Sequence, residues 1–114
     1  MPRREQPVPE KTPRRRSQAE SGDLLRIFVH NDEITPMDFV VHVLVSVFLL
    51  PTINAEQVMY SAHLNGRAYV QTLPEDEARR RIGRACFAAR LGQFPLRFSI
   101  ETDWDRAGIG GYAT

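Results

Sequence analysis

Asn31, Asp32 and His63 are the residues whose polar groups best suit the binding of a ligand. Asn31 and Asp32 follow a stretch of alternating apolar residues and precede Thr35-Pro36, a pair typical of a helix start. An amide and a carboxylate are therefore held on a short turn between two regular elements, where side chains keep a fixed position. The chemistry that these groups offer is hydrogen bonding and charge, because no activated nucleophile accompanies them.

Six regular elements are predicted around this turn. Alternating residues such as Leu25, Ile27 and Val29 predict strands, and Asn65-Gly66 and Gly92 are typical of helix ends. We expect strands at 24–30, 67–72 and 96–101, and helices from Thr35 to Leu50, from Asn54 to Asn65 and from Pro74 to Gly92. This β-α-α-β-α-β order predicts an α+β two-layer sandwich, in which three helices pack on one face of a three-stranded antiparallel sheet.

The first two helices are joined by a short connection, so we expect them to form an antiparallel pair. Thr35 and Asn54 are the predicted N-caps. In such a pair Asn31, Asp32 and His63 would meet at the rim of a hollow. Its wall would consist of Met37, Val40, Met59 and Ala62. The alternative is a capped turn beside a half-buried histidine with no ligand, and the residues alone leave both open.

The sequence carries no pattern typical of an enzyme or a metal site. It has no GxGxxG, P-loop, CxxC or HExxH motif, and its three histidines are scattered. Cys86 is the single cysteine and lies in a helical pattern among alanines, which indicates a small core residue. A single cysteine also fits a reducing compartment. We therefore expect no catalytic activity, metal or cofactor.

Composition predicts one small domain with a tail at each end. The 114 residues suffice for one modest core, which we place at 23–101. Residues 1–22 are basic and rich in proline, which predicts a flexible arm, and we expect residues 102–114 to form a loosely held tail. The longest apolar run, residues 39–51, is too short for a membrane span. Nucleic-acid binding through the arm and the arginines at 79–81 and 84 is a second hypothesis, although no aromatic residue in the arm could stack on bases.

Three segments resemble the signature of the ClpS adaptor family. HNDEITPMDFVVHVL resembles its N-D-[DE]-x-T-P-M-[ED]-F-V motif, VMYSAHLNGRAYV its Met-x-x-x-His-x-x-Gly segment, and FPLRFSIETD its closing strand. Order and spacing agree from about Leu24 to Glu101. The resemblance implies a monomeric adaptor of the ATP-dependent Clp protease in the bacterial cytoplasm. It would bind proteins with an N-terminal Leu, Phe, Tyr or Trp and deliver them to a ClpA-type AAA+ unfoldase, without contacting nucleic acid or membrane.

The resemblance also implies roles for particular residues. Asn31, Asp32 and His63 would bind the free α-amino group and the first peptide unit. A hydrophobic pocket for the first side chain would be formed by Ile34, Thr35, Met37, Val40, Met59, Ala62 and Leu96. Asp76 and Arg81 match positions that contact the N-terminal domain of the unfoldase, and otherwise belong to a solvated helix face.

Some residues depart from the family pattern. Glu33 stands where a second aspartate is commoner, Ile34 where an aromatic residue is frequent, and Ala62 where valine is frequent. The departures leave open a paralogue that binds the unfoldase but has altered or lost recognition of the N-terminal residue and acts as an inhibitor or modulator.

Overall fold

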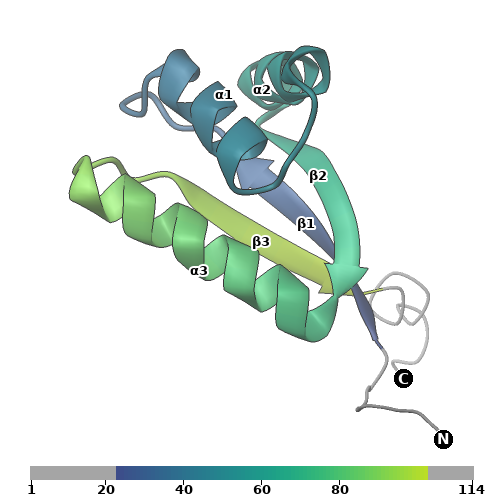
Figure 1. Ribbon diagram of the computed structural model, residues 1–114. Helices are drawn as coiled ribbons and strands as arrows, with labels where there is room; N and C mark the ends of the chain where they lie inside the picture. Colours follow the sequence, from purple (N-terminus) through teal and green to yellow (C-terminus); the bar gives the residue numbers. More distant parts are fainter. Residues whose placement is uncertain (1–22, 103–114) are drawn as a thin grey trace, which may run out of the picture.

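The computed structural model describes residues 23–102. Its elements are β1 (Leu24–His30), α1 (Met37–Ser46), α2 (Thr52–Asn65), β2 (Arg67–Pro74), α3 (Glu75–Leu91) and β3 (Arg97–Thr102). The predicted α+β class and element order are confirmed. Helix α3 runs along the sheet, while α1 and α2 lie together at one end of it (Figure 1). The predicted arm at 1–22 and the tail beyond Thr102 lie outside the described residues, and Thr102 itself ends β3.

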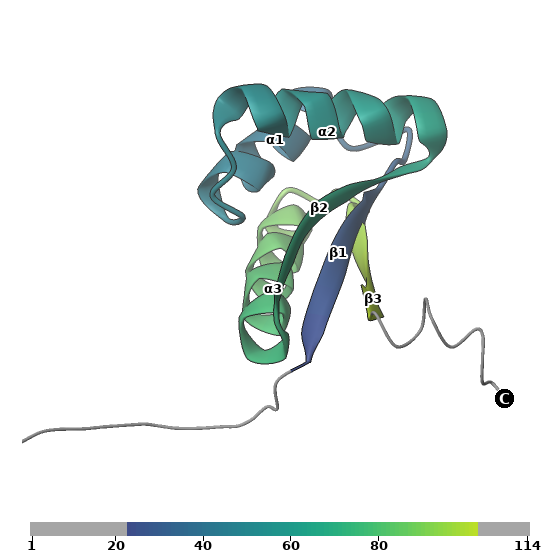
Figure 2. The same ribbon diagram turned by 90° about the vertical axis from the view of Figure 1, so that its right-hand side faces the viewer.

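Strand β1 is the centre of the sheet. The strand order is β2-β1-β3, and β1 pairs with both neighbours in antiparallel orientation. Leu25, Ile27 and Val29 are buried, whereas the alternate residues of β1 are only partly buried or exposed. This difference follows the predicted alternation, because successive side chains of a strand point to opposite faces. Helix α3 covers one face of the sheet, and the other face is open (Figure 2).

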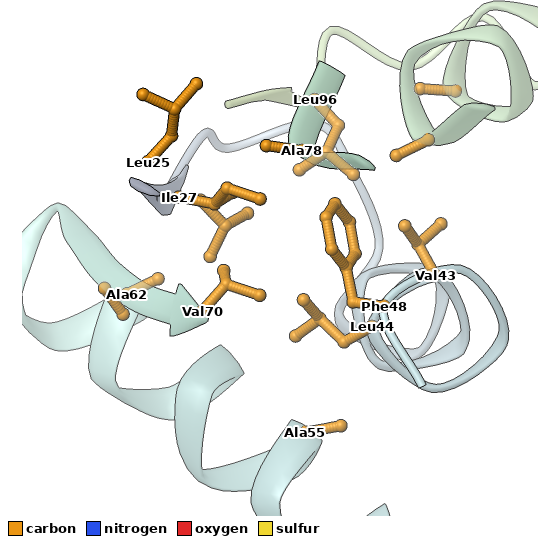
Figure 3. Close-up of a cluster of buried hydrophobic side chains, with 14 residues drawn as sticks. Leu25, Ile27, Val43, Leu44, Phe48, Ala55, Ala62, Val70, Ala78 and Leu96 are labelled. Atoms are coloured by element: carbon orange, nitrogen blue, oxygen red, sulfur yellow. The ribbon is translucent and has the colours of Figure 1, made fainter. Parts of the chain in front are cut away.

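The hydrophobic core lies between the inner face of the sheet and all three helices (Figure 3). Phe48, in the connection after α1, is fully buried. Helix α3 contributes only alanines to the fully buried set, so its backbone can lie close to the strands. The buried helix residues are Val43 and Leu44 of α1, Ala55, Met59 and Ala62 of α2, and Ala78, Ala85 and Ala89 of α3. Among residues 23–102 no helix has the length and apolar character that a membrane crossing requires.

Both predicted N-caps are wrong. Helix α1 begins at Met37 with Pro36 at the cap position, and the Thr35 hydroxyl donates instead to the Asp32 carboxylate at 2.9 Å. Helix α2 begins at Thr52 with Pro51 at its cap, so Asn54 lies inside the helix. Each helix thus starts directly after a proline, whose extended conformation ends the preceding segment.

Helix α1 also ends earlier than predicted. Its last residue is Ser46, and the chain then turns through Leu49, which has a left-handed φ of 61°. This reversal places Phe48 in the core, and the Leu50 N–H donates to the carbonyl of Leu44 at 3.1 Å. A left-handed residue is a common means of ending a helix. The chain therefore leaves the helix and buries Phe48, although the helical pattern of apolar residues continues to Leu50 in the sequence.

Two glycines offer a matched test of backbone conformation. Gly66 follows α2 with φ = 93°, whereas Gly83 lies inside α3, and a Cβ at either position would meet no atom within 4 Å. We expect Gly66→Ala to lower the free energy of unfolding by about 1 kcal/mol, because alanine disfavours the left-handed region. Gly83→Ala should raise it by up to about 1 kcal/mol. Urea unfolding of both variants measures this, and effects of the same sign would contradict the assigned conformations.

Candidate functional site

A cavity of about 460 Å³ opens where the end of β1, the start of α1 and the end of α2 meet. Its deep residues are apolar, since Met59, Ala62 and Leu96 are each less than a tenth exposed. Its edge is polar, because Asn31 and His63 are exposed and Asp32 is partly exposed. The lining residues are Val29, His30, Asn31, Asp32, Glu33, Thr35, Met37, Val40, Met59, Ala62, His63 and Leu96.

The turn after β1 is organised by the carboxylate of Asp32. Its Oδ1 accepts hydrogen bonds from the N–H groups of Thr35 at 2.6 Å and Ile34 at 2.8 Å, and its Oδ2 accepts from the Thr35 hydroxyl. At the start of the turn the Asn31 N–H donates to the carbonyl of Gly66 at 2.9 Å. The turn is thereby fixed both internally and to the end of α2. It can present the Asn31 and Asp32 side chains without first having to become ordered.

Asp32 is held in its charged form. Partial burial raises its pKa, but the hydrogen bonds from the Thr35 N–H, the Ile34 N–H and the Thr35 hydroxyl outweigh burial. The net result is a pKa below the ordinary value of 3.8. An ionised carboxylate has about four lone-pair sites, of which the turn uses three. Asp32 thus keeps both its charge and room for a further donor.

This lowered pKa predicts a pH dependence of stability. Because the folded pKa of Asp32 lies below the unfolded value, its contribution is fully present above about pH 5 and is lost as the pH falls through the folded pKa. We expect the difference in unfolding free energy between the wild type and Asp32→Asn to shrink between about pH 5 and pH 2. Urea titrations across that range measure the difference. A value that stays constant would contradict the role given to the charged carboxylate.

All the residues predicted for the site line the cavity except Ile34. The side chain of Ile34 is 69% exposed, because its neighbour Thr35 is the residue that turns inward. The start of α1 and the end of α2 both contribute to the cavity, through Met37 and His63. Whether these residues bind an α-amino group remains a prediction.

Val29, His30 and Glu33 also line the cavity and were not predicted. They flank Asn31 and Asp32 directly in the sequence, and this adjacency is the signal that could have identified them. The His30 Nε2 lies 2.6 Å from the Ser99 Oγ, within hydrogen-bonding distance. Burial, and then the charges of Arg97 and Arg67, lower the pKa of His30, so its imidazole is neutral at neutral pH.

Arg81 does not belong to a solvated helix face. Its guanidinium donates to Glu77 at 2.7 Å and to both the Phe48 carbonyl and Gln71 Oε1 at 3.3 Å. Gln71 Nε2 donates to the same carbonyl at 3.1 Å. Arg81 therefore fastens α3 to the connection between α1 and α2. Asp76 is exposed, as its predicted role requires. The predicted contact of both residues with an unfoldase stays a prediction.

No reaction centre can be recognised in the part of the chain that the structure describes. Cys86 is a partly buried free thiol on α3, and Ala85 rather than Cys86 is fully buried. Within residues 23–102 no three His, Cys, Asp or Glu side chains are grouped so that they could hold a metal ion. The site described above can accept hydrogen bonds, attract a cation and enclose an apolar group, which are the properties of a binding site.

Comparison with known proteins identifies the family. The family model of ClpS, the ATP-dependent Clp protease adaptor protein, matches residues 20–99. The chain belongs to the ClpS family. This is a family of adaptors and not of proteases. The resemblance inferred from the three sequence segments is thereby confirmed.

Relatives and a solved structure agree with this assignment. The ClpS adapter proteins of Syntrophus aciditrophicus and Treponema denticola are 35% and 38% identical over 78 and 76 residues, which cover 68% and 67% of this chain and 73% and 75% of theirs. The structure of Agrobacterium tumefaciens ClpS2 bound to L-phenylalaninamide is 32% identical, with a TM-score of 0.67. That match covers 70% of this chain and 96% of ClpS2.

Proposed function

We propose that this ClpS-family adaptor binds proteins that carry a bulky hydrophobic N-terminal residue and delivers them to a ClpA-type unfoldase for degradation. The observation that carries the proposal is the joining of two unlike surfaces in one cavity. Hydrogen-bond acceptors of Asn31, Asp32 and His63 lie at its edge, and apolar side chains form its depth. A free N-terminal residue has the complementary arrangement, with a charged amine attached to the carbon that bears the side chain.

The α-ammonium group suits the polar edge of the cavity. It is a compact cation with three donors and therefore needs three acceptors. The Asn31 amide oxygen, the Asp32 carboxylate and an imidazole nitrogen of His63 are three acceptors of the required kinds. The negative charge of Asp32 strengthens its hydrogen bond to a cation. Acceptors that are left without donors reduce the free energy gained on binding, so the site discriminates against a ligand with a blocked amine.

The first side chain suits the apolar depth. Burial of a Leu or Phe side chain contributes roughly 1.5–3 kcal/mol, which supports capture while still allowing release. Met37 is 43% exposed and lies at the mouth, where it would crowd side chains branched at Cβ. L-phenylalaninamide, the ligand of the related ClpS2, has a free amine, a benzyl side chain and one amide, as does an N-terminal Phe.

Peptides that differ only in residue one test the proposal. We expect peptides that begin with Phe or Leu to bind at least about tenfold more tightly than those that begin with Ala or Val, because the small and β-branched residues lose burial or meet Met37. Calorimetry or fluorescence anisotropy measures the affinities. Equal affinities for all four peptides would contradict a side-chain pocket.

Delivery requires a separate measurement with the N-terminal domain of a ClpA-type unfoldase. We expect a ternary complex of peptide, adaptor and unfoldase domain in gel filtration, weakened by Asp76→Arg on the exposed start of α3. Binding of the unfoldase domain without binding of any peptide would instead identify the chain as a modulator that has lost recognition.

A further inference from the structure

Two arginines flank His30 across the open face of the sheet. In the register of the strands, His30 of β1 pairs with Arg67 of β2 on one side and with Arg97 of β3 on the other. Residues that pair directly across antiparallel strands point to the same face. This cross-strand row of Arg67, His30 and Arg97 lies on the face that α3 leaves open (Figure 2). We call it the basic row.

The basic row meets the cavity at one residue. His30 itself lines the cavity. The two arginines do not line the cavity, but each lies beside His30 on a neighbouring strand and directly follows a residue of the site, Leu96 or Gly66. A chain held at the polar edge of the cavity by its α-amine would meet the two arginines if its next residues extended past His30 onto the open face of the sheet.

Among the described residues, a neighbouring carboxylate pairs with only one of the two arginines in the row. Glu101 lies 2.8 Å from Arg67, which also packs over the Phe28 ring at 4.3 Å from its centroid. Arg97 is exposed, and within residues 23–102 it has no ion pair. Burial and the two guanidinium groups lower the pKa of His30. The row thus consists of one paired and one unpaired arginine around a neutral imidazole.

Charges of opposite sign therefore lie on either side of His30. The carboxylates of Asp32 and Glu33 line the cavity on the turn that leads to α1, and the guanidinium groups lie outside the cavity on the strands that flank β1. A substrate with a positive charge at its α-amine and negative charges a few residues later complements both sets of charges. Charge complementarity of this kind selects among partners more than it raises affinity.

We propose that the basic row is an extended specificity site, which favours acidic side chains at the second to fourth positions of the bound N-terminus. This inference rests on the proposed function, because it needs the first residue to occupy the cavity. An extended peptide turns successive side chains to opposite sides, so only some of these positions will face Arg97.

Peptides that begin with Phe and carry either Glu or Lys at positions two to four test the proposal. We expect the Glu peptide to bind about fivefold more tightly, near the upper end of what an exposed ion pair contributes. The preference should shrink at about 1 M salt, where charges are screened within about 3 Å. Single Glu substitutions at each position identify the one that faces the row.

Charge reversal provides the decisive variant. Arg97→Glu should invert the preference, so that the Lys peptide binds more tightly than the Glu peptide. The matched control is Arg84→Glu on α3, which makes the same charge change at an exposed residue that does not line the cavity. It should leave the preference for Glu in place.

Two outcomes overturn different statements. If Phe-initiated peptides bind without a preference for Glu, or if Arg97→Glu leaves that preference unchanged, the extended site is wrong and the proposed function stands. If no Phe-initiated peptide binds whatever residues follow, the proposed function is overturned and the extended site with it.

Discussion

Replacement of Asp32 by alanine is expected to weaken the binding of a Phe-initiated peptide by about 100-fold. The change removes the one carboxylate that the proposal places against the α-ammonium group, and a charged hydrogen bond of this kind contributes roughly 1.5–3 kcal/mol. It also leaves the N–H groups of Ile34 and Thr35 without their acceptor, which loosens the turn that presents Asn31. Isothermal titration calorimetry on the folded variant measures the loss.

Two further variants separate charge from turn geometry. Asp32→Asn keeps an oxygen that can accept the Ile34 and Thr35 N–H groups but removes the charge, so we expect an intermediate loss of affinity. Asp38→Ala removes an exposed carboxylate from the first turn of α1, outside the cavity lining. It should cost at most about 1 kcal/mol of stability and change affinity by less than about twofold. Wild-type affinity in a folded Asp32→Ala variant would contradict the role given to this carboxylate.

The sheet could be predicted from the sequence because its signal is local and repeated. Leu25, Ile27 and Val29 alternate with residues of the other face, and a period of two indicates a strand with one buried face. Gly66 was a correct helix-end signal, since its left-handed φ is one that glycine adopts readily. Such patterns depend on neighbours in the chain and need no knowledge of distant contacts.

The start of α1 could not be predicted with the same success, because two local patterns competed. Thr35 before Pro36 is typical of an N-cap, but Asp32 stands three residues earlier and offers a charged acceptor. The structure uses the aspartate, and Thr35 becomes a donor to it. A charge-assisted hydrogen bond is stronger than a neutral one, which explains why Thr35 bonds to Asp32 and does not cap α1. The sequence alone did not show which of the two bonds would form.

The role of Arg81 depended on contacts far along the chain. Its place on α3 suggested a solvated face, yet it donates to the Phe48 carbonyl across 33 positions of sequence. That carbonyl is available because α1 ends early and the chain reverses at Leu49. No local sequence pattern predicts the early end of α1 or the chain reversal at Leu49. For the cavity, the sequence predicted both polar-edge and apolar residues that line it, but it also included Ile34, whose side chain is exposed.

Family membership and the binding site rest on different observations. The match over residues 20–99 shows that the chain belongs to the ClpS adaptors. The cavity, with acceptors at its edge and apolar residues in its depth, is what suits it to a free N-terminal residue. If these features act together, binding depends above all on the free α-amine of the ligand.

Affinity for one Phe-initiated peptide before and after N-acetylation tests that point most directly. Acetylation removes the positive charge and two of the three donors, while the Phe side chain and the rest of the peptide stay the same. Asn31, Asp32 and His63 would then face a neutral amide, and unpaired acceptors cost about 1–3 kcal/mol, more for a charged one. We predict that the acetylated peptide binds at least about 100-fold more weakly than the free one. Equal binding of the two peptides would contradict the account.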